Sequence, residues 1–253
     1  MCLLNRVTAE MSEFHATPHL ANAVYDILSA PTAYELSFQQ LSTESQVNSY
    51  IESNFAFVEP VQYKLHNLSA DDCSTEYMQY VPLLETLKVL LRNDDMFSSV
   101  VNSQQSSDNR MRDFCDGSLY QQHPLFSTDS CTLQIILYYD DFTAVNALGH
   151  RAKKYKISAF YFMLGNVQPK DRSRLHTIYL VALCYATAVK KCGFDEVLRP
   201  LINDLTVLAD QGIVLERADG TITLRGALCA VVADNLAAHS VGGYLVVFYH
   251  APM

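Results

Sequence analysis

Two apolar segments of the chain end in aspartate. Asp140 and Asp141 lie at the end of CTLQIILYYDDF (131–142), and Asp234 ends ALCAVVAD (227–234). Phosphoryl transfer assisted by two divalent cations needs carboxylates from separate strands at one edge of a sheet, with the cations roughly 3.5–4 Å apart. Mg²⁺ suits such a site because it prefers hard oxygen ligands. The pattern therefore makes Asp140, Asp141 and Asp234 candidate catalytic and metal-binding residues.

Structural roles for the same acids stay open. An acid after a strand is also a common turn former or helix N-cap, and Asp234 followed by Asn235 fits a cap equally well. In the doublet, only one of Asp140 and Asp141 can point to a given face because side chains alternate along a strand. If the metal site is present, one of the doublet carboxylates should lie within about 4–8 Å of Asp234.

A basic segment follows the first candidate acids. Between residues 151 and 174 there are seven cations and one acid, Asp171. Such a segment is either an ordinary solvated surface or a set of phosphate contacts that position nucleic acid without reading its sequence. The candidate nucleic-acid-binding residues are Arg151, Lys153, Lys154, Lys156, Lys170, Arg172 and Arg174.

Charge and cysteine usage narrow the class of protein. Residues 1–130 carry a net charge of −11 and residues 131–253 carry +2, so nucleic acid, if bound, contacts the second half. The seven cysteines are scattered without a C-x-x-C pair, which is typical of reduced thiols. The sequence shows neither a secretory signal nor a long apolar span. We therefore expect a nuclear or cytoplasmic protein, neither secreted nor in a membrane.

Helical periodicity dominates the first part of the chain. Apolar residues recur at helical spacing over 20–58, and YMQYVPLLETLKVLLR (77–92) predicts an amphipathic helix with an apolar Leu83–Leu91 face. The polar stretch SSVVNSQQSSDNR that follows is typical of a linker. We expect a helical N-terminal region at 1–97, a linker and lead-in at 98–130, and an α/β domain at 131–253.

The second half predicts a mixed sheet with a helical insertion. Segments 131–142 and 156–167 are rich in β-branched and aromatic residues and favour an antiparallel hairpin. Helices are expected over 172–191 and 195–211, with Gly212 at the C′ position. Short strands flank the Asp219-Gly220 turn, and segment 227–234 is the last expected strand.

The second half also resembles the CACTA (En/Spm-like) DNA transposase family. The likeness lies in LYYDDFTAVNALGHRAKKYKISAFYFMLGNVQPKDRSRLHTIYLVAL and in VLRPLINDLTVLADQGIVL with ITLRGALCAVVADNLAAHSVGGY. Upstream, DFCDGSLYQQHPLFS looks like the lead-in of animal members. The family segment GN-x-x-P-x-x-R is matched by Gly165, Asn166, Pro169 and Arg172. The similarity covers about residues 75–244.

This resemblance implies a DDE/D transposase with an RNase H-like fold. Such an enzyme cuts the ends of a DNA element and joins the 3′ hydroxyls to target DNA with Mg²⁺ or Mn²⁺. The family's first two acids would correspond to Asp140 or Asp141 and to Asp234. The third acid would lie well downstream, and LVVFYHAPM replaces the cysteine-containing segment with which the family continues. We therefore expect a truncated, transposon-derived protein that is inactive alone.

Two other classes of protein remain as alternatives. In one, the chain is a domesticated, non-catalytic scaffold that binds a protein partner through the Leu83–Leu91 face. In the other, it is a small-molecule enzyme, but the sequence contains no glycine-rich phosphate loop or nucleophile elbow to support that interpretation.

Overall fold

A computed structural model describes residues 43, 45–47, 49, 57–66, 75–101, 111–129, 131–143, 156–218 and 220–233. Nearly all of these belong to one compact unit, Pro60–Phe142 with Ile157–Met253; the other unit comprises Met1–Glu59 and Thr143–Lys156. The expected helices at 20–58 lie almost wholly outside the described residues. Among the few residues of this segment that are described, 45–47 and 49 are helical.

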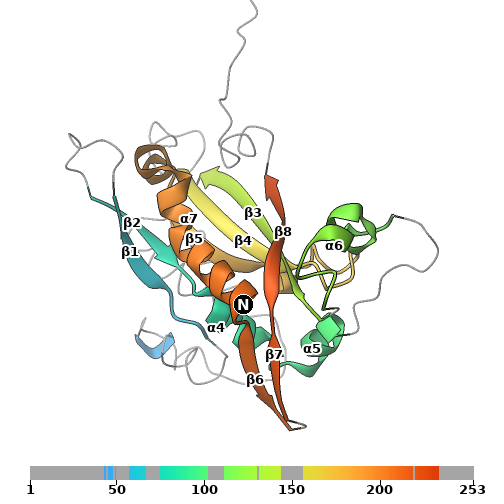
Figure 1. Cartoon of the computed structure of the whole chain (residues 1–253). Coiled ribbons are helices and arrows are strands. Elements are labelled where there is room, and N and C mark those ends of the chain that lie inside the picture. Colours follow the sequence, from blue (N-terminus) through green and yellow to red (C-terminus); the bar gives the residue numbers. More distant parts are fainter. Residues whose placement is uncertain are drawn as a thin grey trace, which may run out of the picture. The chain divides into compact units, whose positions relative to one another are not determined.

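The fold is mixed α/β and is organised around a six-stranded sheet (Figure 1). Pairing is antiparallel for β1 (Val61–Leu65) with β2 (Glu76–Tyr80), for β2 with β5 (Tyr179–Tyr185), and for β5 with β4 (Lys156–Leu164). It is parallel for β3 (Leu133–Thr143) with β8 (Gly226–Ala233). The contacts of β3 with β4 run in opposite directions, from Asp141–Ser158 to Gln134–Gly165, so this pair is antiparallel too. In spatial order the strands are β1, β2, β5, β4, β3 and β8.

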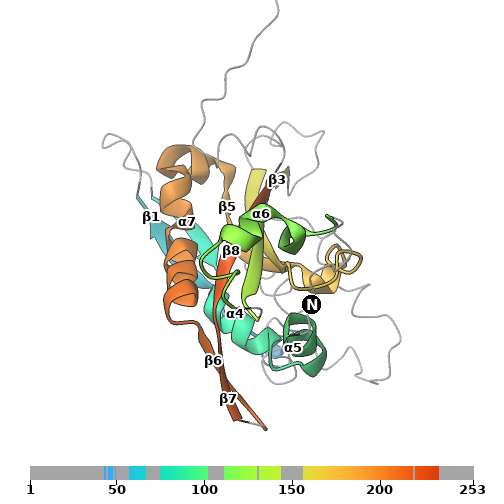
Figure 2. The same ribbon diagram turned by 45° about the vertical axis from the view of Figure 1, so that its right-hand side comes forward.

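The long helix α7 (Ala186–Asp210) lies across one face of this sheet in both views (Figures 1 and 2). Its backbone breaks at Gly193, which has φ 82°. Strands β6 (Ile213–Arg217) and β7 (Gly220–Leu224) form a separate antiparallel hairpin after α7. The remaining elements are α4 (Leu83–Leu90), α5 (Asp94–Val101), α6 (Ser118–Gln122), and the 3₁₀ turns η2 (Phe114–Asp116) and η3 (Leu175–Thr177).

The core lies between the sheet and its helices. Odd-numbered residues of β3 are buried in it because alternate side chains of a strand point to the same face, and α7 contributes Val197, Leu201 and Leu208. Full burial of each such side chain is worth about 1.5–3 kcal/mol. The core residues from β3 are Leu133, Ile135, Leu137 and Tyr139.

The expected strands of the second half are confirmed. Segment 131–142 covers all of β3 except Thr143, segment 156–167 contains β4, and the segments beside Asp219-Gly220 form the β6/β7 hairpin. Gly212 ends α7 with φ 76°, and its amide donates to Val207 O, as expected of a C′ glycine. A Cβ at this glycine would lie 2.6 Å from Leu224 O, so only glycine fits.

Two expected helices are partly strands. Segment 77–92 begins in β2 and only then forms α4, and segment 172–191 contains η3 and β5 before α7 starts at Ala186. In β5 the five central residues are all buried. A strand covered on both faces is apolar throughout, and a short run of this kind has no periodicity that separates it from a helix.

The Leu83–Leu91 face belongs to the chain's own core. Leu83, Leu87 and Leu91 are fully buried, and their cluster includes residues of β3 and α7. The expectation that this face binds a protein partner is therefore wrong, because its apolar surface is already covered. An amphipathic pattern shows that one side of a helix is buried but does not show against what.

Helix α4 is capped by a residue far along the chain. Pro82 occupies the N-cap position and makes no side-chain capping bond. Instead, Leu83 N and the Tyr80 hydroxyl both donate to Asp204 Oδ2 of α7, at 2.9 and 2.8 Å. Burial raises the pKa of Tyr80 well above its usual value, and the charge and hydrogen bond of Asp204 add to this rise. The phenol therefore stays a donor.

Replacing Asp204 with alanine should lower the free energy of unfolding by about 1–3 kcal/mol, because the α4 amide and the Tyr80 hydroxyl lose their shared acceptor. Urea unfolding of the full chain followed by circular dichroism measures the change. Asn203→Ala, at the exposed neighbouring position of α7, is the control and should change stability by less than about 0.5 kcal/mol. Equal effects of the two substitutions would contradict the capping role.

Candidate functional site

The carboxyl ends of β3 and β8 lie at the same edge of the sheet. The two strands are parallel neighbours, and their register pairs Tyr138 with Val232 and Tyr139 with Ala233. Asp140 and Asp141 follow within β3, while Asp234, the residue after Ala233 in sequence, lies outside the described residues. The predicted separation between the doublet and Asp234 therefore stays a prediction, but the strands that lead to both are adjacent.

The two acids of the doublet have different surroundings. Asp141 is on the same side of β3 as Tyr139 and is partly buried. Its Oδ1 accepts hydrogen bonds from the Tyr139 hydroxyl at 2.7 Å and from Ser158 Oγ at 2.5 Å. Asp140 is exposed; its Oδ1 accepts from the Asp141 amide at 2.8 Å, and Tyr138 OH approaches its Oδ2 at 3.5 Å.

Apolar packing fixes the groups around Asp141. The Tyr139 ring stacks on Phe160 at 4.8 Å between centroids and meets Phe194 edge-on at 5.2 Å. Phe194 follows directly after the backbone break at Gly193. Ser158, on β4, is fully buried. A carboxylate beside such a surface keeps its charge at lower cost when hydroxyl groups donate to it.

The neighbouring titratable groups are held neutral. Burial raises the pKa of Tyr139. The hydrogen bond with Ser158 lowers this pKa in part, and the hydrogen bond and charge of Asp141 raise it further. Burial also raises the pKa of the Cys184 thiol to about 12, with a further contribution from Asp141. On the other side of the sheet, burial and then the charge of Asp140 raise the pKa of Tyr161. The edge therefore combines the two carboxyl groups of the doublet with neighbouring hydroxyl and thiol groups whose pKa values are raised.

This arrangement offers hard oxygen ligands of the kind that Mg²⁺ and Mn²⁺ prefer. The carboxylates of Asp140 and Asp141 are such ligands and fit a divalent cation by donor type. Within the described ranges, no group of three or more His, Cys, Asp or Glu side chains is placed to hold a metal ion.

The residues of the basic segment have unlike positions. Arg151, Lys153 and Lys154 lie outside the described residues. Lys156 and Lys170 are exposed, and Arg174 is exposed beside Asp171, to which it forms an ion pair at 3.0 Å.

Arg172 points into the protein. Its guanidinium binds both carboxylate oxygens of Asp113, with 2.7 Å from Nη1 to Oδ1, and also donates to the carbonyls of Val167 and Gly165. Only 15% of the Arg172 side chain and 19% of that of Asp113 are exposed. Asp113 also accepts from Phe114 N at 2.8 Å and so caps η2. Arg172 therefore links the segment after β4 to the lead-in before β3.

The other residues of the GN-x-x-P-x-x-R segment hold β4 against β3. Asn166, buried, accepts from Gln134 N at 2.8 Å and donates to Thr132 O at 3.0 Å. Gly165 N donates to Gln134 O at 2.7 Å, and a Cβ on Gly165 would lie 2.9 Å from Gln134 Cβ. The segment is thus a structural connection that fixes the start of β3.

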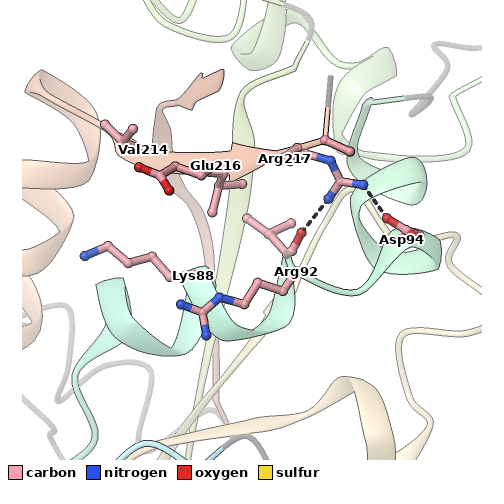
Figure 3. Close-up of a pocket in the computed structure, with 9 residues that line it drawn as sticks. Lys88, Arg92, Asp94, Val214, Glu216 and Arg217 are labelled. Atoms are coloured by element: carbon pink, nitrogen blue, oxygen red, sulfur yellow. Dashed lines mark hydrogen bonds and ion pairs between the residues drawn. The ribbon is translucent and has the colours of Figure 1, made fainter. Parts of the chain in front are cut away.

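A pocket of about 890 Å³ lies between α4 and β6 (Figure 3). Lys88 of α4 and Arg92, just after α4, line it together with Val214 and Glu216 of β6. Arg217 closes one side by donating to Leu91 O at 3.2 Å and to Asp94, with its guanidinium 3.9 Å from the Phe97 ring centroid. Arg217 thus links α5 to the β6/β7 hairpin. Both charge signs line the pocket, so it does not select one class of ligand.

Sequence patterns did not identify three residues of these networks. Tyr139 and Ser158 hold Asp141, and Asp113 holds Arg172. Ser158 could have been noticed in the sequence, because it is the one serine in the otherwise mostly apolar strand KISAFYFML. Nothing in the spacing of Asp113 and Arg172, 59 positions apart, predicts their contact.

No protein-family model matches this sequence, and no curated protein matches it significantly. The resemblance to CACTA transposases therefore stays a prediction. In the described part of the chain, no helix is both long enough and apolar enough to cross a membrane.

Removing the Arg172 side chain should lower the free energy of unfolding by about 2–4 kcal/mol, because it leaves the Asp113 carboxylate partly buried without its cation. Arg174→Ala is the matched control. It breaks an ion pair whose arginine is 60% exposed, so the loss should stay below about 1 kcal/mol. Chemical denaturation measures both. A small loss for Arg172→Ala accompanied by weaker DNA binding would instead assign this arginine to the surface contact.

Proposed function

We propose that the chain derives from a DDE/D transposase and contains the first strands of an RNase H-like catalytic domain. The observation that carries this proposal is the parallel pairing of β3 with β8, Tyr139 opposite Ala233. Each of these strands leads to a candidate acid, and parallel neighbours present their carboxyl ends at one edge of the sheet. Two-metal phosphoryl transfer requires carboxylates from separate strands at such an edge.

The proposed ancestral reaction is hydrolysis of a DNA phosphodiester followed by strand transfer. In hydrolysis, a water oxygen bonds to phosphorus, the bond to the 3′ oxygen breaks, and that oxygen leaves as a hydroxyl. In transfer, this 3′ hydroxyl attacks a target phosphodiester and displaces a target oxygen, so no redox partner is needed. Bound Mg²⁺ or Mn²⁺ would lower the barrier by activating the attacking oxygen and stabilising the leaving oxygen.

The chain's own contribution would be to hold the cations with Asp234 and one acid of the Asp140-Asp141 doublet. The resemblance assigns only two of the three acids to positions of this sequence. Because carboxylate placement provides much of the electrostatic stabilisation in such sites, we expect metal binding to be weak and DNA cleavage to be slow or absent in this chain alone.

Mn²⁺ titration of the full chain, followed by electron paramagnetic resonance, tests this proposal. Wild-type protein should bind Mn²⁺ saturably. Both Asp234→Asn and the double variant Asp140→Asn/Asp141→Asn should weaken binding about tenfold or more, a change of about 1.4 kcal/mol. Asp210→Asn, an exposed acid at the far end of α7, is the control and should bind as wild type.

Binding that is absent in wild type, or that is unchanged in both aspartate variants, would overturn the proposed metal site. Nicking of supercoiled plasmid in Mn²⁺ gives a second measurement. Rapid nicking that depends on Asp234 would support the transposase origin but contradict the expectation of an inactive chain.

DNA would contact the basic segment 151–174. The Arg172 guanidinium is occupied by Asp113 and two carbonyls, so the proposed contacts come from Arg151, Lys153, Lys154, Lys156, Lys170 and Arg174. These cations would bind the phosphate backbone without reading bases. We expect the binding to be weak and strongly dependent on salt.

The triple variant Arg151→Ala/Lys153→Ala/Lys154→Ala should bind duplex DNA more weakly and show a shallower salt dependence. The slope of log K against log salt should fall by about 0.9 for each phosphate that the variant no longer neutralises. Fluorescence anisotropy at several salt concentrations measures it. Lys88→Ala/Arg92→Ala, which removes two cations in and just after α4, is the control. If both variants lose the same DNA affinity, DNA binding depends on the net charge of the protein and not on the basic segment.

The non-catalytic scaffold is a weaker alternative. Its expected binding surface, the Leu83–Leu91 face, is buried in the core. No other observation on the described residues favours it over an origin in a nuclease.

A further inference from the structure

We propose that two copies of this chain associate through β8, whose outer edge pairs antiparallel with β8 of the second copy. Strand β8 ends the six-stranded sheet beyond β3 (Figure 1). Within the described residues, β8 is paired by backbone hydrogen bonds with β3 alone, so its outward amide and carbonyl groups have no partner there. Such a row of groups is a template for another strand. This inference does not depend on the proposed function.

The two edges of the sheet differ in the side chains that protect them. Natural edge strands usually avoid pairing with other chains by carrying charged residues or proline. Strand β1, at the opposite edge, contains the exposed Lys64. Strand β8, GALCAVVA, contains neither a charge nor a proline. Three of its apolar side chains are exposed, and β8 is therefore the less protected edge. They are Leu228 at 37%, Val231 at 42% and Val232 at 45%.

The exposed apolar residues of β8 are arranged for pairing with a copy of the same strand. Leu228 pairs with Ile135 of β3. Val231 pairs with Leu137, and because both β3 residues belong to the core, Leu228 and Val231 lie on the same face of the sheet. Residues three apart in a regular strand would lie on opposite faces. Here β8 has an extra residue, Cys229, where its register with β3 shifts. An antiparallel copy can therefore place Val231 opposite Leu228 twice, once in each half of the pair.

The charges that flank β8 fit the same alignment. Aligned antiparallel with itself, the segment RGALCAVVAD (225–234) sets Arg225 opposite Asp234 at both ends. Arg225 makes no ion pair within the described part of the chain. Opposite charges directly across a strand pair stabilise it, whereas like charges weaken it. One segment thus supplies both halves of a twofold-symmetric interface, which selects a second copy of this chain as the partner.

The extra residue in β8 is compatible with this pairing. A bulge usually turns an edge strand away from partners. In the alignment of 225–234 with itself, Cys229 falls opposite Ala230, next to the twofold axis. The bulges of the two copies therefore meet at the centre, and the flanking halves of each strand remain regular.

Sedimentation velocity of the full chain over the micromolar range tests the inference. EDTA keeps divalent cations away from Asp234, which is also a candidate metal ligand. Wild type should form dimers whose fraction rises with concentration. Val231→Lys should weaken dimerisation about tenfold or more, because it places two ammonium groups in the interface. Val61→Lys, at a 42% exposed position of β1 on the opposite edge, is the matched control and should dimerise as wild type.

Exchanging the flanking charges tests the antiparallel alignment. Arg225→Glu should weaken dimerisation about fivefold, because a glutamate then lies opposite Asp234 in both halves of the pair. The double variant Arg225→Asp/Asp234→Arg exchanges the two charges and should restore wild-type affinity. An exchange variant that dimerises as weakly as Arg225→Glu would overturn the alignment. Circular dichroism checks that each variant is folded; should Val231→Lys unfold, Val232→Lys introduces the same charge on the other face of β8.

Wild type that stays monomeric would overturn the inference, and amide hydrogen exchange then identifies the state of the edge. Slow exchange throughout β8 would show that another part of the same chain covers it, whereas rapid exchange of its outward amides would show an edge left open. Equal weakening of the dimer by Val231→Lys and Val61→Lys would also overturn the inference, since dimerisation would then depend on the net charge of the protein and not on β8.

Discussion

The parallel pairing of β3 with β8 constrains most of this structure. Parallel neighbours cannot be joined by a tight turn, so the chain must return to the amino-terminal end of the sheet between the two strands. In this protein the return begins with β4 and β5 and is completed by α7 and the β6/β7 hairpin. Helix α7 thereby covers one face of the sheet and supplies the apolar side chains that bury the odd-numbered residues of β3. The same pairing brings the ends of β3 and β8 to one edge.

Polar groups near the ends of elements are satisfied by partners that are distant in sequence. Asp204 caps α4 across 121 positions, Asp113 binds Arg172 across 59, and Asn166 bonds to the backbone at both Gln134 and Thr132. A buried donor or acceptor without a partner costs about 1–3 kcal/mol. These bonds therefore help to select one packing of the helices and the lead-in against the sheet, in addition to the apolar contacts that drive collapse.

The edge that carries the doublet combines rigidity with charge. On one side of β3, Asp141 is bound by two immobile hydroxyls beside aromatic rings; on the other, Asp140 is exposed to water. The same element thus presents two identical side chains in different dielectric surroundings. A charge near a low-dielectric surface interacts more strongly with its neighbours than one in water does, so the two acids have different electrostatic surroundings.

The sequence by itself determined the strands that contain β-branched and aromatic runs, the Asp-Gly hairpin and the Gly212 helix end. These features depend on local backbone preferences, which neighbouring residues largely set. It did not determine that β2 and β5 are strands, because their apolar residues fit a buried strand and a helix equally well. It also assigned the Leu83–Leu91 face to a partner, since periodicity marks a buried face without naming what covers it.

For the candidate site, the sequence identified the acids and the basic segment but not their surroundings. The alternation of side chains already implied that Asp140 and Asp141 point to opposite faces. Only the tertiary structure decided which face packs against α7, and hence that Tyr139 and Ser158 bind Asp141. It likewise turned Arg172 inward to Asp113. These contacts join residues far apart in sequence, so they follow from packing of the whole sheet and not from any local pattern.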